Sequence, residues 1–323
     1  MQQRPYLMIM SNTSCNTNYL SNFPSPIWNY TFGTINAVNA FTAIVENSFV
    51  LFIILWYKEL CTISDGILIS LVITDLLAGC TTSPLYAVKL FSETISLNCT
   101  VEEVRRSLGA VLIGASALSV AAISYDRYLR MMKLHNYSQH MTKGKCILLV
   151  LLCWVIAGSL PLLRHLPKTE IYYVIAFSTL MALVFLLLII LYFLVLNSLR
   201  QRASWRQRSV QIEKQQMRSV KIVILIITVY VLMALPVMIP LILMPLQIDS
   251  ETMGAIYVSV LTLNNLNSSA NPIIYYYRNP FIRKYAKKLL GLDTKSNHDG
   301  LSAKARSATV VQNLESVDSN KIT

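Results

Sequence analysis

The sequence is poor in charged side chains, which make up 14% of its 323 residues, whereas hydrophobic residues make up 54%. Soluble globular domains carry about 25% charged residues, and the mean hydropathy of this chain is +0.50. The chain also lacks an internal repeat of the kind found in inverted-repeat transporters. We therefore expect one membrane domain and not a set of soluble domains.

Catalytic signatures are missing as well. The sequence contains no HExxH zinc motif and no GxGD motif. Asp75 is the only aspartate midway along a long apolar stretch, so the paired aspartates of an intramembrane protease are absent. Since each of these chemistries needs its motif, we expect that the protein is not an enzyme.

Long apolar stretches are abundant. A helix that crosses the hydrocarbon core of a bilayer needs about 20 mostly apolar residues. Seven segments meet this requirement, at residues 34–57, 66–89, 105–131, 145–164, 171–196, 218–243 and 253–277. The prediction is an all-α membrane protein with a seven-transmembrane helix bundle. We expect an extracellular N-terminal segment over 1–33, the membrane domain over 34–290 and a disordered cytoplasmic tail over 291–323.

Lysine and arginine predict the orientation. With the N-terminus outside, only 6 of the 28 basic residues fall in outer segments, as the positive-inside rule requires. Three N-x-S/T sequons, at Asn12, Asn29 and Asn98, lie in the same outer segments and are predicted to be glycosylated. The net charge of +12 follows from this topology and from attraction to anionic membrane lipids. A docking surface for an acidic cytoplasmic partner is compatible with it, and binding to nucleic acid is not implied.

Most of the six cysteines lie in predicted spans or at their cytoplasmic ends. Only Cys15 and Cys99 face the oxidising side, where disulfides persist. Two outcomes remain open. Either these two cysteines pair and tie the N-terminal segment to the third span, or both stay free thiols.

Polar side chains inside the spans are costly and therefore mark candidate functional positions. They are Asn47 in the first span, Asp75 in the second, Ser116 in the third, and Asn267 and Asn271 in the seventh. Asn267 and Asn271 are four residues apart and share a helix face, and Pro272 frees one backbone carbonyl. Either these groups form a hydrogen-bond network that holds helices together, or their oxygen atoms bind a hard cation.

The cytoplasmic ends of two spans also carry candidate functional residues. Asp126 and Arg127 end the third span, and Ser116 precedes Arg127 by about three helical turns, so both point to one side. Arg127 either extends to the lipid interface or has a specific role. Pro236 is predicted to kink the sixth span, as a moving part or as a static bend. After the seventh span, residues 279–290 predict an amphipathic helix on the inner membrane surface.

Together these residues resemble the rhodopsin-like (class A) G-protein-coupled receptors over about residues 34–290. The motifs are Asn47, the LxxxD sequence ending at Asp75, Asp126-Arg127-Tyr128, Trp154, Pro236 and the NPIIY sequence from Asn271 to Tyr275. Each motif is modest alone, but their order and depth in seven spans are specific. The resemblance implies a plasma-membrane receptor that converts binding of an extracellular ligand into activation of a heterotrimeric G protein.

The resemblance also implies roles for single residues. Asp126 would hold Arg127 at rest, and Tyr192 and Tyr275 would rearrange inward on activation. An allosteric sodium ion would bind at the polar positions of the spans, which are Asp75, Ser116, Asn267 and Asn271, with Asn47 nearby. A receptor kinase and arrestin would be further partners.

Departures from the family pattern bear on the ligand. Ala234 stands where a helix 6 tryptophan is usual, and Glu102 stands where most relatives have the cysteine of a loop disulfide. This pattern is similar to the melanocortin, cannabinoid, lysophospholipid and adenosine receptor group, and the short loop before the fifth span is most melanocortin-like. Gly109 replaces the aspartate of amine receptors, so a monoamine ligand is not expected.

Charged residues near the outer mouth leave the ligand class open. They are Glu93, Glu102, Glu103 and Arg106. The three carboxylates suit a basic peptide, or they pair with neighbouring arginines and form a solvated rim. A lipid or a nucleoside is also compatible with an open mouth.

Two other classes of function are compatible with parts of the sequence. A channel or transporter would use Asp75 and the asparagines as a permeation path, but it gives no reason for the Asp-Arg-Tyr sequence at the cytoplasmic end. A receptor-shaped protein that no longer signals and acts as a membrane partner is the second alternative, and the missing tryptophan at Ala234 is its basis.

Overall fold

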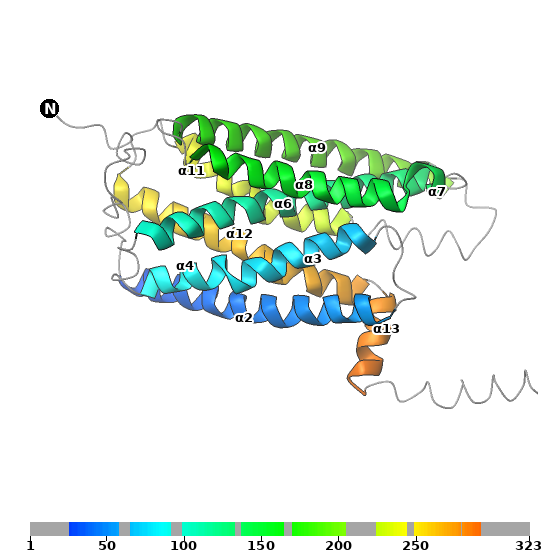
Figure 1. Ribbon diagram of the computed structural model, residues 1–323, viewed down its shortest axis with the longest axis horizontal. Coiled ribbons are helices and arrows are strands. Elements are labelled where there is room, and N and C mark those ends of the chain that lie inside the picture. The colour runs from blue at the N-terminus through cyan, green and yellow to red at the C-terminus, as the bar shows by residue number, and fades with distance from the viewer. Residues whose placement is uncertain are drawn as a thin grey trace, which may run out of the picture. The chain divides into compact units, whose positions relative to one another are not determined.

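The computed structural model describes residues 26–57, 65–91, 99–132, 137–164, 170–204, 224–243, 249–278 and 280–291, and within these ranges all regular secondary structure is helical. The long helices are α2 (Pro26–Trp56), α3 (Asp65–Cys80) with α4 (Thr82–Phe91), α6 (Cys99–Met132), α8 (Lys143–Arg164), α9 (Glu170–Ser204) and α12 (Ser250–Arg278). These helices run side by side in a bundle (Figure 1). A further helical segment covers 224–243.

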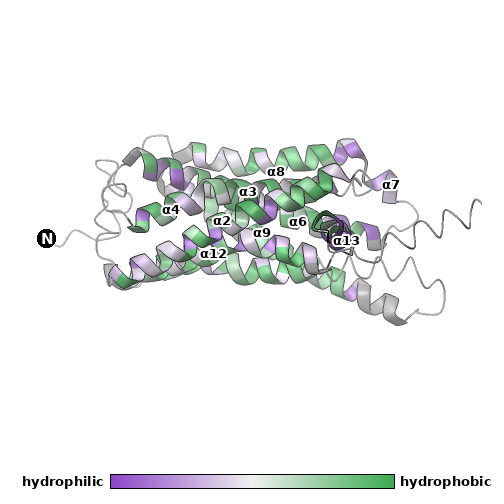
Figure 2. Cartoon of the chain, turned by 90° about the horizontal axis from the view of Figure 1, so that it is seen from below, coloured by the Kyte–Doolittle hydropathy of each residue, from purple (hydrophilic) through white to green (hydrophobic). Residues whose placement is uncertain are grey.

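Helices lie where the seven spans were predicted. Four of the described segments are long and apolar enough to cross a membrane, namely Pro26–Trp56, Asp65–Phe91, Thr100–Arg130 and Tyr172–Ser198. Helices α8 and α12 and the segment over 224–243 lie at the remaining three predicted spans. Hydrophobic residues cover most of the bundle, and hydrophilic ones gather at α7 (Tyr137–His140) and the neighbouring end of α8 (Figure 2).

Two helices begin earlier than their predicted spans. The first starts at Pro26 and not at residue 34, and the third starts at Cys99 and not at residue 105. Proline suits the first turn of a helix because its missing N–H would have no partner there. The first turns of both helices extend past the apolar windows from which the spans were predicted.

Prolines interrupt two of the spans. The second span breaks at Thr81, between α3 and α4, because Pro84 has no N–H to donate to the carbonyl of Cys80. In the sixth span the α-helix over 224–234 gives way to a 3₁₀ turn, η3 (Leu235–Met238), and then to α11 (Ile239–Leu243). This change of helix type contains Pro236, where the sequence predicted a kink.

Helix α6 lies at the centre of the bundle. It contacts α3, α4, α8 and α9, whereas α2 contacts α3, α4 and α12. Small residues allow the close approaches. A Cβ atom added to Gly79 of α3 would lie 3.0 Å from Ala43 Cβ of α2, and one added to Gly114 of α6 would lie 3.3 Å from Ala157 Cβ of α8.

A short basic helix follows the bundle in the sequence. Helix α13 (Pro280–Leu289) belongs to a second compact unit and carries Lys287 and Lys288 in its last turn. Gly291 follows with φ of 67°, a left-handed conformation that glycine adopts without strain after a helix. A helix was predicted at this place.

Candidate functional site

A small cavity inside the bundle contains the carboxylate predicted to be functional. It has a volume of about 40 Å³ and is lined by residues of α3, α4, α6, α12 and the 224–234 helix, among them Asp75, Ser116, Asn267 and Tyr230. Asp75 is 2% exposed and accepts a hydrogen bond of 2.8 Å from Asn271 Nδ2. The residues predicted as one polar site on three spans are therefore brought together around this space, which we call the Asp75 cavity.

Oxygen atoms without partners surround the Asp75 cavity. Ser116 Oγ, Asn267 Oδ1 and Asn271 Oδ1 are buried and make no hydrogen bond among the described residues. Buried oxygens are normally satisfied by protein or by water, and about 15 Å³ is enough for one water molecule. Hydroxyl, amide and carboxylate oxygens are the ligands of hard cations. The oxygen ligands and the space therefore fit one sodium ion, which Asp75, Ser116 and Asn267 would hold.

Asn47 lies beside the Asp75 cavity and does not line it. Its Nδ2 donates to Ala43 O and to Ser268 O, both at 2.9 Å, and it is not among the residues that line the Asp75 cavity. Asn47 thus joins α2 to the backbone of α12 beside the cavity. Since Ser268 lines the cavity, Asn47 acts on it by fixing α12.

The interface between α2 and α12 carries further buried amides, which we call the asparagine seam. Its members are Asn36, Asn39 and Asn47 of α2 with Thr262, Asn265, Ser268 and Ser269 of α12. Asn36 Nδ2 donates to Thr262 Oγ1 and Asn265 Nδ2 donates to Asn36 Oδ1, both at 2.8 Å. Sequence reasoning missed Asn36 and Asn39, although their spacing of three residues places them on one helix face.

Trp154 connects three helices through hydrogen bonds. Its indole Nε1 donates to Ser70 Oγ at 3.0 Å, and Ser70 Oγ lies 3.2 Å from Ser119 Oγ. This chain of hydrogen bonds joins α8 to α3 and α6. The tryptophan that contributed to the resemblance therefore helps to hold these helices together.

A second polar cluster surrounds Asp126, near the C-terminal end of α6. The Asp126 carboxylate is 1% exposed and lies 3.7 Å from Arg127 Nε and 3.5 Å from Arg130 Nε. Tyr137 of α7 donates its hydroxyl to Asp126 Oδ1, and the guanidinium of Arg130 lies 4.3 Å above the Tyr137 ring. Two cations and a phenol thus share one carboxylate. Tyr137 was not predicted, and no sequence motif marks it.

Aromatic residues lie at the same end of the bundle. Tyr128 of α6 and Ile224 pack against buried Val195 of α9, which joins the third, fifth and sixth predicted spans. Tyr192 of α9 makes an edge contact with Phe193, with ring centroids 5.7 Å apart. Helix α12 continues through Pro272; it also contains Tyr275, whose side chain lies outside the described residues.

Four charged residues meet near the first turn of α6, at the end opposite Asp126. Glu102 Oε1 accepts bonds from Lys89 Nζ at 2.8 Å, Arg105 Nη2 at 2.8 Å and Arg106 Nε at 2.6 Å. Arg105 Nε also donates to Glu102 Oε2 at 2.8 Å, which makes that pair bidentate. We call Lys89, Glu102, Arg105 and Arg106 the outer cationic cluster. Pairing with neighbouring cations, one of the two alternatives drawn from the sequence, is what Glu102 does here.

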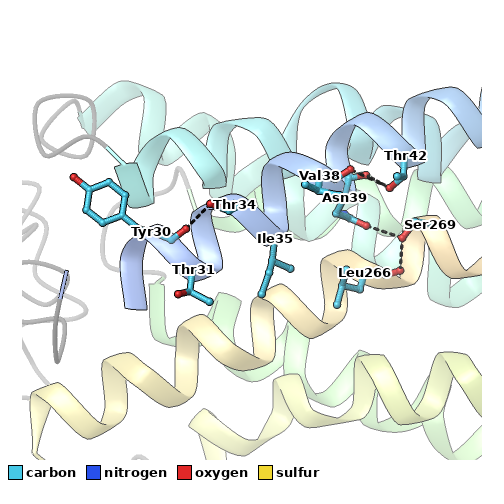
Figure 3. Close-up of a pocket in the computed structure, with 9 residues that line it drawn as sticks. All are labelled: Tyr30, Thr31, Thr34, Ile35, Val38, Asn39, Thr42, Leu266 and Ser269. Carbon is cyan, nitrogen blue, oxygen red and sulfur yellow. Dashed lines mark hydrogen bonds between the residues drawn. The ribbon is translucent and has the colours of Figure 1, made fainter. Parts of the chain in front are cut away.

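A larger groove lies on the outer surface of α2 and α12. It has a volume of about 570 Å³, and its walls include Tyr30, Ile35 and Val38 of α2 with Leu266 of α12 (Figure 3). Two of its threonines bond within their own helix: Thr34 Oγ1 donates to Tyr30 O at 2.7 Å, and Thr42 Oγ1 donates to Val38 O at 3.0 Å. In a bilayer this open, mostly apolar groove faces lipid.

Some predicted residues fall outside the described part of the chain. They are Asn12, Cys15, Glu93 and Asn98, together with the side chain of Cys99. Asn29 is described and lies in the first turn of α2, with its Oδ1 buried and unpartnered. Glu103 is described and is partly exposed beside Glu102. Glycosylation and the Cys15–Cys99 pairing stay predictions.

Comparison with known proteins identifies similar chains. A family model described as 7 transmembrane receptor (rhodopsin family) matches residues 46–275. The adenosine receptor A3 of Ovis aries is 24% identical over 288 residues, covering 80% of this chain and 88% of that one. The sphingosine 1-phosphate receptor 3 of Takifugu rubripes is 29% identical over 250 residues, covering 69% and 60%. The crystal structure of squid rhodopsin superposes with a TM-score of 0.71 at 16% identity, over 84% of this chain and 87% of that one. The predicted fold is confirmed.

Proposed function

Because the chain belongs to the rhodopsin family of seven-transmembrane receptors, and is therefore a G-protein-coupled receptor and not an enzyme, we propose a specific route of signalling. An extracellular ligand that is a peptide, a lipid or a nucleoside, and not a monoamine, stabilises an open state of the bundle. That state binds a heterotrimeric G protein on the cytoplasmic side. Ligand and G protein then raise each other's affinity, because each binds the open state better.

The observation that carries this proposal is the Asp126 cluster. Arg127 is held beside a buried carboxylate that also binds Arg130 and the Tyr137 hydroxyl. A shared carboxylate gives each cation a weaker hold than an exclusive pair would, so a change of helix packing releases Arg127. Released, the guanidinium presents several donors to backbone carbonyls of a partner protein. Tyr128, Tyr192, Tyr275, Pro236, Asn271 and Pro272 belong to the same switch in this proposal.

A sodium ion in the Asp75 cavity forms part of the proposed resting state. Asp75, Ser116 and Asn267 would hold the ion, and Asn271 and Asn47 would keep α12 in place. The bound ion supplies a positive charge that compensates the buried carboxylate. The cavity offers the single carboxylate of Asp75 with neutral oxygens, which favours a monovalent ion.

The topology proposed from the basic residues places α7 and α13 in the cytoplasm. The outer cationic cluster then faces the extracellular side, and the glycosylation sites Asn12, Asn29 and Asn98 lie there too. Residues 1–33 form the extracellular segment and 291–323 the cytoplasmic tail in this proposal. Membrane lipids, a receptor kinase and arrestin are its further proposed partners.

The test is ligand-free activation of a panel of G-protein types in cells by the parent receptor and by Arg127→Ala at matched surface levels. We expect basal activation that falls at least tenfold in Arg127→Ala. Arg130→Ala is the matched control, because Arg130 contacts the same Asp126 oxygen at a similar distance. Equal losses in both variants would assign the effect to Asp126 alone. A parent that activates no G protein would favour the alternative of a receptor-shaped membrane partner.

A further inference from the structure

The outer cationic cluster holds more positive charge than its own carboxylate neutralises. Lys89, Arg105 and Arg106 carry three positive charges around the single negative charge of Glu102. Glu103 follows Glu102 directly and is turned about 100° around α6. Even with its charge counted, the balance remains positive by one.

This surplus is located in a largely dry environment. The side chains of Lys89, Glu102 and Arg105 are 4%, 9% and 8% exposed. Buried charges without a counter-charge are expensive, because the protein replaces the solvation of water only poorly. A protein that keeps a surplus positive charge there gains free energy when an anion joins it.

Arg106 makes part of this surplus positive charge accessible to solvent. Its side chain is 38% exposed, and only its Nε is used in the bond to Glu102. Its two terminal NH₂ groups therefore have no partner among the described residues. A planar guanidinium with free donors binds carboxylate or phosphate through two parallel hydrogen bonds.

Tyr86 supplies an independent sign of an absent ligand. The residue is 1% exposed, and its hydroxyl is buried without a hydrogen-bond partner. Its ring lies 5.1 Å under the guanidinium of Arg105 and packs with Leu90 and Val258. A buried phenol without an acceptor beside the Arg105 guanidinium is a further donor for an incoming oxyanion.

We propose that the outer cationic cluster binds an anionic group, a phosphate or a carboxylate, of the extracellular ligand. The assignment rests on the proposed function and narrows its ligand class. Arg106 makes the first contact, and Arg105, Lys89 and Tyr86 surround the group once it has entered. Glu102 orients the three cations and does not itself contact the ligand. A basic peptide would meet charge of its own sign here.

The experiment uses the full-length receptor purified in neutral detergent and follows thermal unfolding at constant ionic strength. The probes are oleyl phosphate, oleyl alcohol and glycerol 3-phosphate. Oleyl phosphate is expected to raise the midpoint by about 3 °C or more, and oleyl alcohol is not. Glycerol 3-phosphate separates the two sources of the anion, because it stabilises the receptor only if a water-soluble phosphate suffices.

Arg106→Gln should lose the phosphate-dependent rise, and Arg106→Lys should keep part of it, because charge remains while the planar fork is lost. Arg283→Gln on α13 is the matched control and should keep the whole effect. Equal stabilisation by oleyl phosphate and oleyl alcohol would overturn the proposal, and so would an unchanged response of Arg106→Gln. The measurement needs no G protein, so its result stands apart from the test of the signalling function.

Discussion

At the residue scale, polar side chains in the bundle differ in whether all their hydrogen-bonding atoms are used. The Thr74 hydroxyl donates to the backbone oxygen of Leu71 at 2.7 Å. Ser116 Oγ and Asn267 Oδ1 line the same cavity without a partner. Unused oxygens therefore gather around Asp75, where a cation would satisfy them.

This difference predicts an effect of sodium on stability. We expect the parent receptor to melt at a higher temperature in sodium chloride than in potassium chloride, because an ion that binds only the folded state stabilises it by about 2.7 kcal/mol at one hundred times its dissociation constant. Asp75→Asn should abolish this difference, and Ser116→Ala should reduce it. Thermal unfolding of the purified receptor measures it.

Thr74→Val is the matched control for the sodium experiment. It changes a residue that lines the same cavity, but its hydroxyl is already used within α3. The sodium effect should survive in this variant. If the parent itself melts at the same temperature in both salts, the cavity holds water and the polar residues serve packing alone.

Single residues also show what the sequence can predict about a site. Asp75, Ser116, Asn267 and Asn271 were found because polar groups in apolar runs stand out, and helix periodicity put the two asparagines on one face. The partners of Asn36 and the pairing of Lys89 with Glu102 were not predicted, whereas the neighbouring arginines were one of two alternatives for Glu102. The unpredicted contacts depend on how each helix is rotated toward its neighbours, and Lys89 comes from a different helix than Glu102. Local spacing contains no information about that rotation.

At the element scale, contact between α2 and α3 depends on one glycine. A Cβ on Gly79 would lie 3.0 Å from Ala43 Cβ, 3.2 Å from Ile44 N and 3.3 Å from Ala40 O. Two of these atoms belong to the backbone of α2 and cannot rotate away. The helices therefore approach as closely as they do only because position 79 has no side chain.

Gly79→Ala is accordingly expected to lower stability by about 1–3 kcal/mol, the usual cost of overpacking. Gly158→Ala in α8 is the control, because its added Cβ would meet nothing within 4 Å and alanine favours a helix over glycine by up to about 1 kcal/mol. Melting temperatures of the two purified variants should move in opposite directions. Equal shifts would mean that α2 and α3 separate at little cost.

Helix positions were easier to predict than helix details. Apolar runs of about 20 residues locate the spans, because the bilayer requires that length. The break at Thr81 and the early start at Pro26 were not predicted. Both depend on backbone hydrogen bonding near prolines and not on hydropathy, and a window of mean hydropathy averages over such local effects.

At the scale of the whole molecule, the asparagine seam joins the beginning of the helical bundle to its end. Asn36 of α2 bonds to Thr262 and Asn265 of α12, which are 226 and 229 residues further along the chain. Interhelical hydrogen bonds inside membranes contribute about 0.6 kcal/mol each on average. Several such bonds along one interface make the contact between α2 and α12 directional.

Asn36→Ala tests the closure of the bundle. Loss of two interhelical bonds and the unpaired groups left behind should cost about 1–3 kcal/mol. We expect a lower melting temperature and a smaller share of receptor at the cell surface, measured by labelling of intact cells. Thr34→Val is the control, because the exposed Thr34 hydroxyl bonds only within α2. Indistinguishable results for the two variants would contradict the closing role of the seam.

The asparagine seam also has a consequence for synthesis. Asn36 leaves the ribosome 226 residues before Thr262, and at about 5–20 residues per second this is a delay of roughly 10–45 s. Throughout that interval α2 carries three amide side chains whose partners on α12 do not yet exist. A chain cut short before α12 keeps those amides exposed to lipid permanently. The same three residues that close the finished receptor thus leave an unfinished one with costly polar groups in the membrane.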